Sequence, residues 1–379
     1  MGKSKDYQDI VNYRAGSMDK FLQIPRGTES FSLEEAFVHR KINEALSELF
    51  YKWGYLPIET PMFDFYDIYR SMLDPAIEEK IYKLIDRDGD LLMLRSDITL
   101  FMAKQMGLSL SKEDLPVRVC YSDAILRYQS RESISHNEFF QVGCELIGRD
   151  GIRGDLEIIL LLLEAFMEIG VLDIKLHIGS RALFDSVLSE VLDRDGGGGR
   201  SRLLGSVISR EWENLNREME NLGVDSSARE SMLEVFSFIG SGKELSRIKG
   251  RIGRAKEQID YLEEIYSMLE TLGYGDVVRI DLSEVGLQPY YTGLSFSVYT
   301  EGVDSAVAAG GRYNELLKSF GFDSPAVGFS ILLRKLEAKI GKKNGFLPSK
   351  EIVRIDDSDF ITSYRRAKEL RKEGKIVVL

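Results

Sequence analysis

The side chains best suited to holding a ligand lie between residues 121 and 148, in the stretch YSDAILRYQSRESISHNEFFQVGCELIG. Residues 118–126 and 138–147 have strand-like patterns and predict an antiparallel pair joined by a long polar loop. Arg127 follows the first strand, and Gln141 and Glu145 lie on the second. A buried carboxylate such as that of Glu145 would discriminate between ligands, because a ligand that leaves it unpaired loses free energy.

The elements around this pair can be predicted from periodicity. Ser32 and Glu35 have the spacing of a capping box, and apolar residues then recur at helical spacing up to Gly54. We expect further strands at residues 55–60, 277–282, 294–299 and 305–309, and a buried helix near residue 160. Separated strand runs flanked by helices favour an α+β fold with a mostly antiparallel sheet. The apolar positions of the first helix are Val38, Ile42, Ala45, Leu46, Leu49, Phe50 and Trp53.

The stretch 121–148 resembles motif 2 of the histidyl branch of class II aminoacyl-tRNA synthetases, in which a Phe-Arg-x-Glu strand and a Gly-Arg-x-Arg loop precede a Glu-Phe-x-Gln-x-Gly-x-Glu strand. The resemblance runs from Gln23 to about Leu336 and implies a class II synthetase-like sheet flanked by helices. Five further segments match in order: QIPRGTESF, the motif 1 element WGYLPIETPMFD ending at Pro61, LLMLRSDITL, the histidine signature QPYYTGLSFSVY, and AAGGRYNELLKSFGFDSPAVGFSILLRKLE leading into motif 3.

The resemblance implies a pocket for free histidine. By this reasoning Gln141 and Asp97 would hold the amino group, Glu145 would accept an imidazole N–H, and Arg127 would lie near the carboxylate. The histidine-binding set that we predict is completed by Thr99, Tyr290 and Tyr291, the two tyrosines packing against and orienting the ring.

The residues that handle ATP in the synthetases differ in this sequence. Such charged groups stabilise the adenylation transition state by several kcal/mol each, and lysine lacks the planar fork that arginine offers a phosphate. We therefore predict no catalytic residues, and a binding protein descended from an enzyme. The substitutions are Gln129 for the motif 2 glutamate, Ile134, Ser135 and Asn137 in the arginine-bearing loop, Gly286 and Pro289 for the arginine and aspartate of the histidine signature, and Lys335 for the motif 3 arginine.

This combination is similar to the synthetase-like regulatory subunits of ATP phosphoribosyltransferase, which accompany the short-form catalytic subunit in the first step of histidine biosynthesis. The resemblance implies that catalytic subunit as a partner, feedback regulation by free histidine, and a homodimer through motif 1 within a larger hetero-oligomer. The short-form subunit would lack a regulatory domain of its own. The alternative is a divergent histidyl-tRNA synthetase or adenylating amino-acid ligase. A third interpretation is a scaffold or amino-acid sensor with another partner.

Composition narrows these alternatives. The chain has 379 residues and a net charge of −11, which disfavours a wide nucleic-acid-binding face. Cys120 and Cys144 fit buried thiols rather than a disulfide or zinc site, and His39, His136 and His177 are too scattered for a metal site. We expect no cofactor. The start of the chain lacks a signal sequence and no stretch is apolar enough to span a membrane, so we expect a cytoplasmic protein that binds no membrane.

The domain organisation that we predict has four parts. Residues 1–192 and 276–338 form the synthetase-like core, 193–275 form a linker and a helical insertion, and 339–379 form a small strand-helix-strand unit too short for an anticodon-binding domain. The run DRDGGGGR is expected to be a surface linker rather than a phosphate loop. In GGRY, residues 310–313, we expect the glycines to form a tight turn and Arg312 to be a surface pairing residue or a pocket wall.

Overall fold

The computed structural model describes residues 27–28, 30–31, 33–128, 137–191, 198–249, 255–340, 346–347, 351–355 and 359–379. The chain divides into two compact units. The smaller unit comprises residues 61–97 and 124–139 together with the described residues before position 31. The larger unit comprises residues 31–60, 98–123 and 140–379.

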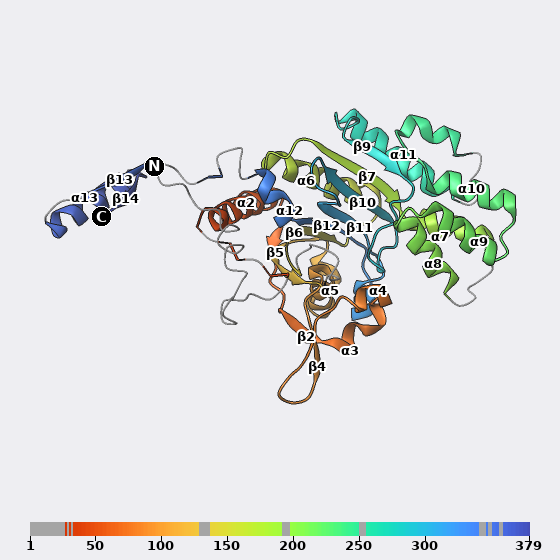
Figure 1. Cartoon of the computed structure of the whole chain (residues 1–379), viewed down its shortest axis with the longest axis horizontal. Helices are drawn as coiled ribbons and strands as arrows, with labels where there is room; N and C mark the ends of the chain where they lie inside the picture. Colours follow the sequence, from red (N-terminus) through yellow and green to blue (C-terminus); the bar gives the residue numbers. More distant parts are fainter. Residues whose placement is uncertain are drawn as a thin grey trace, which may run out of the picture. The chain divides into compact units, whose positions relative to one another are not determined.

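A nine-stranded sheet is the largest structure in the chain, with the strand order β1-β5-β6-β12-β11-β10-β7-β9-β8 (Figure 1). The pairs β1–β5 and β7–β9 are parallel. The pairs β6–β12, β12–β11, β11–β10, β10–β7 and β9–β8 are antiparallel, so the α+β fold with a mostly antiparallel sheet is confirmed. The strands are β1 (Leu56–Pro57), β5 (Val117–Leu126), β6 (Glu138–Ile147), β7 (Ile174–Ser180), β8 (Ile239–Gly240), β9 (Val278–Asp281), β10 (Leu294–Thr300), β11 (Ala308–Arg312) and β12 (Ala326–Leu332).

Helices bury the apolar side chains of this sheet. In β6, Val142, Cys144 and Leu146 alternate with polar or small residues and are fully buried in one cluster with apolar residues of the helices. Burial raises the pKa of both cysteine thiols, that of Cys120 to about 11, in agreement with the predicted structural role. The helices that contribute to this cluster include α2 (Leu33–Lys52), α6 (Ile152–Glu168), α7 (Arg181–Val191), α11 (Lys256–Thr271) and α12 (Arg334–Ile340); α5 (Ile98–Ser109) contributes other buried residues of the larger unit.

The predicted first helix is confirmed as α2. It buries Val38, Ile42, Leu46 and Phe50, the positions that recur at helical spacing. The chain leaves the helix through Gly54, whose φ of +82° lies in the left-handed region that glycine adopts without steric cost. Ser32 lies outside the described residues, so the capping box stays a prediction.

Most residues between 199 and 271, within the predicted insertion, lie in helices. Helix α9 packs against α8 and α10, and α11 packs against β9 and β7 of the sheet (Figure 1). Arg210, two residues after the end of α8, has a φ of +56°, an uncommon conformation for a residue with a Cβ. The helices are α8 (Gly199–Ile208), α9 (Trp212–Asn221), α10 (Ser226–Phe236) and α11, with a 3-10 segment at Gly242–Arg247.

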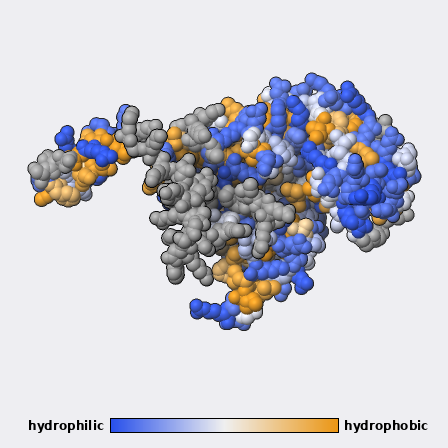
Figure 2. Space-filling model, viewed as in Figure 1, coloured by the Kyte–Doolittle hydropathy of each residue, from blue (hydrophilic) through white to orange (hydrophobic). Residues whose placement is uncertain are grey.

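The smaller unit contains a three-stranded antiparallel sheet, β2-β4-β3. Phe63, Phe65 and Ile85 of this sheet are 54%, 48% and 72% exposed, which places an apolar surface around β2 and β4 (Figure 2). Apolar surface of this kind marks interaction sites in soluble proteins. The elements are β2 (Phe63–Phe65), α3 (Tyr66–Tyr69), the 3-10 turn Arg70–Met72, α4 (Pro75–Glu78), β3 (Lys83–Ile85) and β4 (Leu91–Leu94).

The end of the chain forms the predicted strand-helix-strand unit. Strands β13 (Ile352–Arg354) and β14 (Ile376–Val378) are parallel and are connected by α13 (Phe360–Lys372). Ile355, Ala367 and Val377 form a small core of their own. The side chain of Asp359 caps α13 by accepting hydrogen bonds from two backbone N–H groups. A core of so few residues contributes little free energy of folding.

Two sequence predictions on residues 305–313 were wrong. The strand expected at 305–309 is β11, Ala308–Arg312, and Gly310 and Gly311 lie within it rather than in a tight turn. The physical reason is close approach: a Cβ on Gly310 would lie 2.4 Å from the carbonyl oxygen of Gly328, and one on Gly311 would lie 2.7 Å from that of Leu294.

Arg312 forms an ion pair, but the pair is buried and not at the surface. Its Nε lies 2.9 Å from Oδ1 of Asp155 on α6, and the arginine and aspartate side chains are 7% and 0% exposed. Tyr261 on α11 donates to the other oxygen of Asp155 over 2.6 Å. Burial raises the pKa of Asp155, while the charge and hydrogen bonds of Arg312 act in the opposite direction.

Within the described residues, no helix is both long and apolar enough to cross a membrane.

Replacing Asp155 by asparagine should lower the free energy of unfolding by about 3 kcal/mol, because it leaves a buried arginine uncompensated. The matched control is Asp150→Asn, since Asp150 also contacts Arg312, at 3.1 Å, but is 71% exposed. An exposed partner contributes at most about 1 kcal/mol. Urea denaturation of both variants measures the difference, and equal losses would contradict the buried pair.

Candidate functional site

The register of β6 and β12 determines which side chains share the polar face of the sheet. Gln141, Gly143 and Glu145 alternate along β6 and therefore lie on one face. In the antiparallel pairing with β12, Gly328 lies opposite Glu145 and Ser330 lies opposite Gly143. One long carboxylate side chain thus stands beside two glycines and a serine.

Three hydroxyl groups compensate the buried carboxylate of Glu145, which is 2% exposed. Thr99 on α5 donates to Oε1 over 2.6 Å and Tyr121 on β5 donates over 3.2 Å. Tyr313, which follows β11, donates to Oε2 over 2.5 Å. Burial raises the pKa of Tyr313, and the adjacent Glu145 charge raises it further, so this hydroxyl stays protonated and donates.

The glycines on this face provide the space that the carboxylate occupies. A Cβ on Gly328 would lie 1.6 Å from Oε2 of Glu145. A Cβ on Gly143 would lie 2.5 Å from the hydroxyl oxygen of Tyr121. Any larger residue at either position would displace a member of the Glu145 hydrogen-bond set.

Gln141 is 3% exposed and only partly satisfied. Its Nε2 lies 3.4 Å from the hydroxyl of Ser330, whereas its Oε1 has no hydrogen-bond donor within the described part of the chain. A buried amide oxygen without a donor costs free energy, so this atom is available to a ligand that brings an N–H group.

The two predicted tyrosines form an aromatic group with Tyr313. The ring centroids of Tyr290 and Tyr291 are 5.3 Å apart, and those of Tyr290 and Tyr313 are 5.7 Å apart, both in edge-to-face geometry. Tyr313 connects this group to Glu145 through its hydroxyl. The larger unit therefore brings together Thr99, Gln141, Glu145, Tyr290 and Tyr291 around one sheet face.

Asp97 and Arg127 belong to the smaller unit and pair with each other there. Nη2 of Arg127 lies 3.3 Å from Oδ2 of Asp97, and its Nε donates to the carbonyl oxygen of Ser96 over 2.7 Å. The seven predicted site residues thus fall into two groups, this pair in the smaller unit and the other five in the larger one.

Comparison with known proteins identifies the family. The profile of the histidyl-tRNA synthetase family matches residues 27–336. The chain belongs to this family. It is 32% identical over 368 residues to the ATP phosphoribosyltransferase regulatory subunit of Moorella thermoacetica, covering 94% of this chain and 92% of that protein. It is 33% identical to the protein of the same name from Bacillus subtilis, covering 90% and 86%.

Solved structures show the same relationship. A structure described as an ATP phosphoribosyltransferase regulatory subunit/histidyl-tRNA synthetase from Bacillus halodurans superposes with a TM-score of 0.82 and 25% identity, over 96% of this chain and 93% of the other. Histidyl-tRNA synthetase from Nostoc shares the fold, with a TM-score of 0.76 and 20% identity, over 94% and 85%. The resemblance predicted from the sequence motifs is therefore confirmed.

The structure shows the surroundings of two residues, Gly286 and Lys335, that differ from the histidyl-tRNA synthetase motifs. At Gly286 φ is +75°, and a Cβ would lie 2.3 Å from the Tyr291 ring, so the position leaves no space for an arginine side chain in this conformation. Lys335 extends to the β10–β11 connection, where its Nζ donates to the Ser305 hydroxyl over 2.7 Å and to the Ala306 carbonyl over 3.1 Å. Gln129, Ile134, Ser135 and His136 lie outside the described residues.

Sequence reasoning missed Tyr121 and Tyr313, the two tyrosines that donate to Glu145. Tyr121 lies in the predicted strand 118–126, and Tyr313 ends the GGRY segment, where the sequence pattern points only to the glycines and Arg312. Strand alternation does not indicate which residues of separate strands meet across a sheet, so the sequence carried no signal for these contacts.

Gly328→Ala should lower the free energy of unfolding by about 2 kcal/mol or more, since the new methyl group and the Glu145 carboxylate cannot occupy the same volume. Gly205→Ala is the control. Gly205 lies exposed in α8, where an added methyl group would meet no atom within 4 Å, and alanine there should stabilise by about 0.5 kcal/mol. Thermal denaturation of both variants tests this, and a Gly328→Ala protein as stable as the wild type would disprove the close contact.

Proposed function

We propose that this chain is a non-catalytic regulatory subunit of ATP phosphoribosyltransferase, which binds free histidine and acts with the short-form catalytic subunit in the first step of histidine biosynthesis. The observation that carries the proposal is the Glu145 site, a buried carboxylate held by three hydroxyl donors beside a glutamine whose carbonyl oxygen has no donor among the described residues. The names of the relatives supply the assembly in which such a site would act.

The chemistry of the site matches histidine. An imidazole N–H can donate to the Glu145 carboxylate, and an ammonium group can donate to Oε1 of Gln141. The edge-to-face tyrosines Tyr290 and Tyr291 offer a surface for a planar ring. The roles that the family motifs give Asp97 and Arg127, a carboxylate for the ammonium group and a guanidinium for the histidine carboxylate, stay predictions from the sequence.

Regulation requires that histidine bind two states of the assembly with different affinity, and such couplings are typically about 1 to 3 kcal/mol. Because a short-form catalytic subunit would have no regulatory domain of its own, the response to histidine would be transmitted from this chain. The assembly that we propose contains this chain as a homodimer within a larger hetero-oligomer in the cytoplasm. The exposed Phe63 within the motif 1 stretch and Phe65 directly after it support an interface in that region.

Glu145→Gln should weaken histidine binding about ten- to a hundredfold, because it removes a charge-assisted hydrogen bond worth roughly 1.5 to 3 kcal/mol. Calorimetric titration with histidine measures this. Glu315→Gln, which alters a glutamate whose side chain is 65% exposed, serves as the control and should bind as the wild type does. Failure of the wild type to bind histidine, alone or with the catalytic subunit, would refute the histidine site.

Adding this chain to its cognate short-form catalytic subunit should change the rate of phosphoribosyl-ATP formation and make that rate sensitive to histidine. Glu145→Gln or Tyr291→Ala should reduce the sensitivity of the rate to histidine and leave assembly intact.

Light scattering should show a dimer for this chain alone and a larger species for the mixture with the catalytic subunit. Identical rates and identical histidine responses with and without the chain would overturn the proposed function.

The chain should not form an aminoacyl adenylate. We infer this from Lys335, whose ammonium group is engaged by the β10–β11 connection, and from Gly286, where an arginine side chain would meet Tyr291. Both positions carry arginines in the synthetase motifs. Purified protein should therefore give no histidine-dependent exchange of pyrophosphate into ATP, and exchange above background would favour the alternative of a divergent synthetase.

A further inference from the structure

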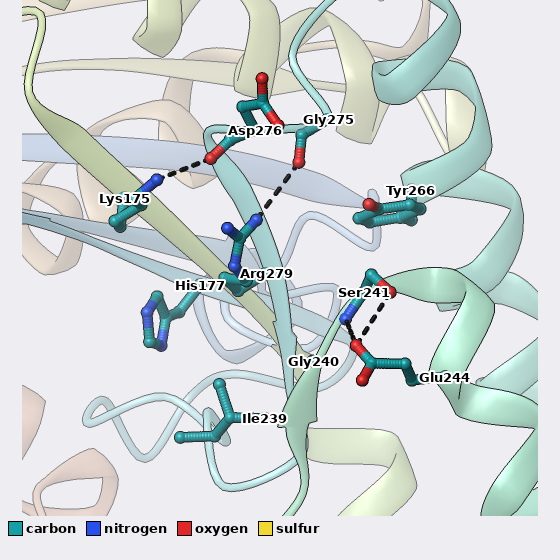
Figure 3. Close-up of a pocket in the computed structure, with 10 residues that line it drawn as sticks. All are labelled: Lys175, His177, Ile239, Gly240, Ser241, Glu244, Tyr266, Gly275, Asp276 and Arg279. Atoms are coloured by element: carbon teal, nitrogen blue, oxygen red, sulfur yellow. Dashed lines mark hydrogen bonds between the residues drawn. The ribbon is translucent and has the colours of Figure 1, made fainter.

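A polar cavity lies in the larger unit, where β7 and β9 meet the helical insertion (Figure 3). Its volume is about 600 Å³. Lys175 and His177 alternate along β7, and His177 pairs with Arg279 of the parallel strand β9, so the three side chains lie on one face of the sheet. Tyr266 of α11 and the segment 239–244 form the opposite wall.

The two cations of this cavity are hydrogen-bonded to main-chain carbonyls rather than to carboxylates. Nζ of Lys175 donates to the Asp276 carbonyl over 2.7 Å. Nη1 of Arg279 donates to the carbonyl of Gly275 over 3.2 Å (Figure 3). It also donates to the carbonyl of Val278 over 2.7 Å, and the other nitrogens of Arg279 have no hydrogen-bond partner among the residues that the structure describes. Each of the two side chains therefore has donors that no described residue uses.

Within the described residues, the acidic side chains that line the cavity form no ion pair with these two cations. Glu244 accepts from the backbone N–H and the hydroxyl of Ser241 over 2.8 and 2.9 Å. These hydrogen bonds lower the pKa of Glu244, and the Arg279 charge contributes least to that shift. The side chain of Asp276 lies at the exposed rim, and its main-chain oxygen is the atom that meets Lys175.

His177 is oriented by a buried aspartate. Its Nδ1 lies 2.8 Å from Oδ2 of Asp281, which is fully buried and also accepts from Arg210 over 2.6 Å and from the Ser283 hydroxyl over 2.6 Å. Burial alone would raise the pKa of Asp281, but the hydrogen bonds from His177 and Ser283 and the Arg210 charge outweigh it and lower the pKa. The aspartate is thus an anion that holds Nδ1 as the donor and fixes the imidazole ring at the cavity wall.

We propose that this cavity binds a phosphate group, with Lys175 and Arg279 as its main donors. A phosphate offers more acceptor oxygens than a carboxylate, which suits donors that reach the cavity from two strands and from α11. The Tyr266 hydroxyl makes no hydrogen bond within the described ranges and is a third donor on the facing wall. Gly242 leaves the space that this ring occupies, because a Cβ at that position would lie 2.4 Å from Cδ1 of Tyr266.

Calorimetric titration of the full chain with inorganic phosphate tests the proposal. The wild type should bind one phosphate per chain, and Arg279→Met and Lys175→Met should each bind at least about tenfold more weakly. The control is Lys243→Met, which removes a positive charge from the neighbouring 3-10 segment at a side chain that is 78% exposed, and it should bind as the wild type does. Circular dichroism and thermal melting establish that each variant is folded.

The proposal fails if phosphate gives no saturable binding to the wild type at millimolar concentration, or if Arg279→Met binds it as tightly as the wild type. A parallel titration with acetate distinguishes phosphate from carboxylate recognition. Acetate bound as tightly as phosphate would overturn the assignment. Loss of binding in Lys243→Met equal to that in Lys175→Met would show a general charge effect instead of a site. The outcome is independent of histidine binding at Glu145.

Discussion

Desolvation of one carboxylate is the constraint around which the central strands are arranged. Glu145 is almost fully buried, and a buried charge is tolerated in a protein only when hydrogen bonds replace its water. Thr99, Tyr121 and Tyr313 supply them from three different elements. Gly328 and Gly143 lack side chains because the carboxylate and the Tyr121 hydroxyl occupy that space. The contacts of helix α5, of the residue after β11 and of the paired strands β6 and β12 thus meet at the single side chain of Glu145.

A second buried aspartate connects the insertion to the sheet. Asp281 at the end of β9 accepts from His177 of β7 and from Arg210, two residues after the end of α8. Arg210 adopts a positive φ, a conformation that costs free energy for a residue with a Cβ and persists where the surroundings hold it. The ion pair with Asp281 is the contact that holds it here. The insertion is therefore anchored to the sheet by charge, while α11 adds apolar contacts with β7 and β9.

Much of the fold followed from sequence patterns, and the reasons are local. Apolar spacing predicted α2 and the buried helix α6, and alternation predicted β5, β6, β9 and β10 to within a few residues. The prediction failed at β11, where Gly310 and Gly311 read as turn residues. Because these two glycines have no side chains, β10 and β12 can lie close to β11 on either side. The local sequence pattern does not show which strands will become neighbours. Of the site, the family motifs indicated Glu145, Gln141 and Thr99, but the donors Tyr121 and Tyr313 depend on cross-strand geometry. The reach of Lys335 toward Ser305 likewise requires the folded hairpin.

The pairing of Glu145 with Gly328 also has a consequence for folding. Side chains alternate between the two faces of a sheet, so a slip of β12 along β6 by one residue would place Val327 or Phe329 beside Glu145. The carboxylate would then meet a bulky apolar residue where it now meets a hydrogen atom. A slip by one residue would therefore push the carboxylate away from the position in which Thr99, Tyr121 and Tyr313 donate to it, and the observed alignment avoids that cost. The residue proposed to recognise a ligand in the mature protein would, during folding, also select the correct alignment of its own sheet.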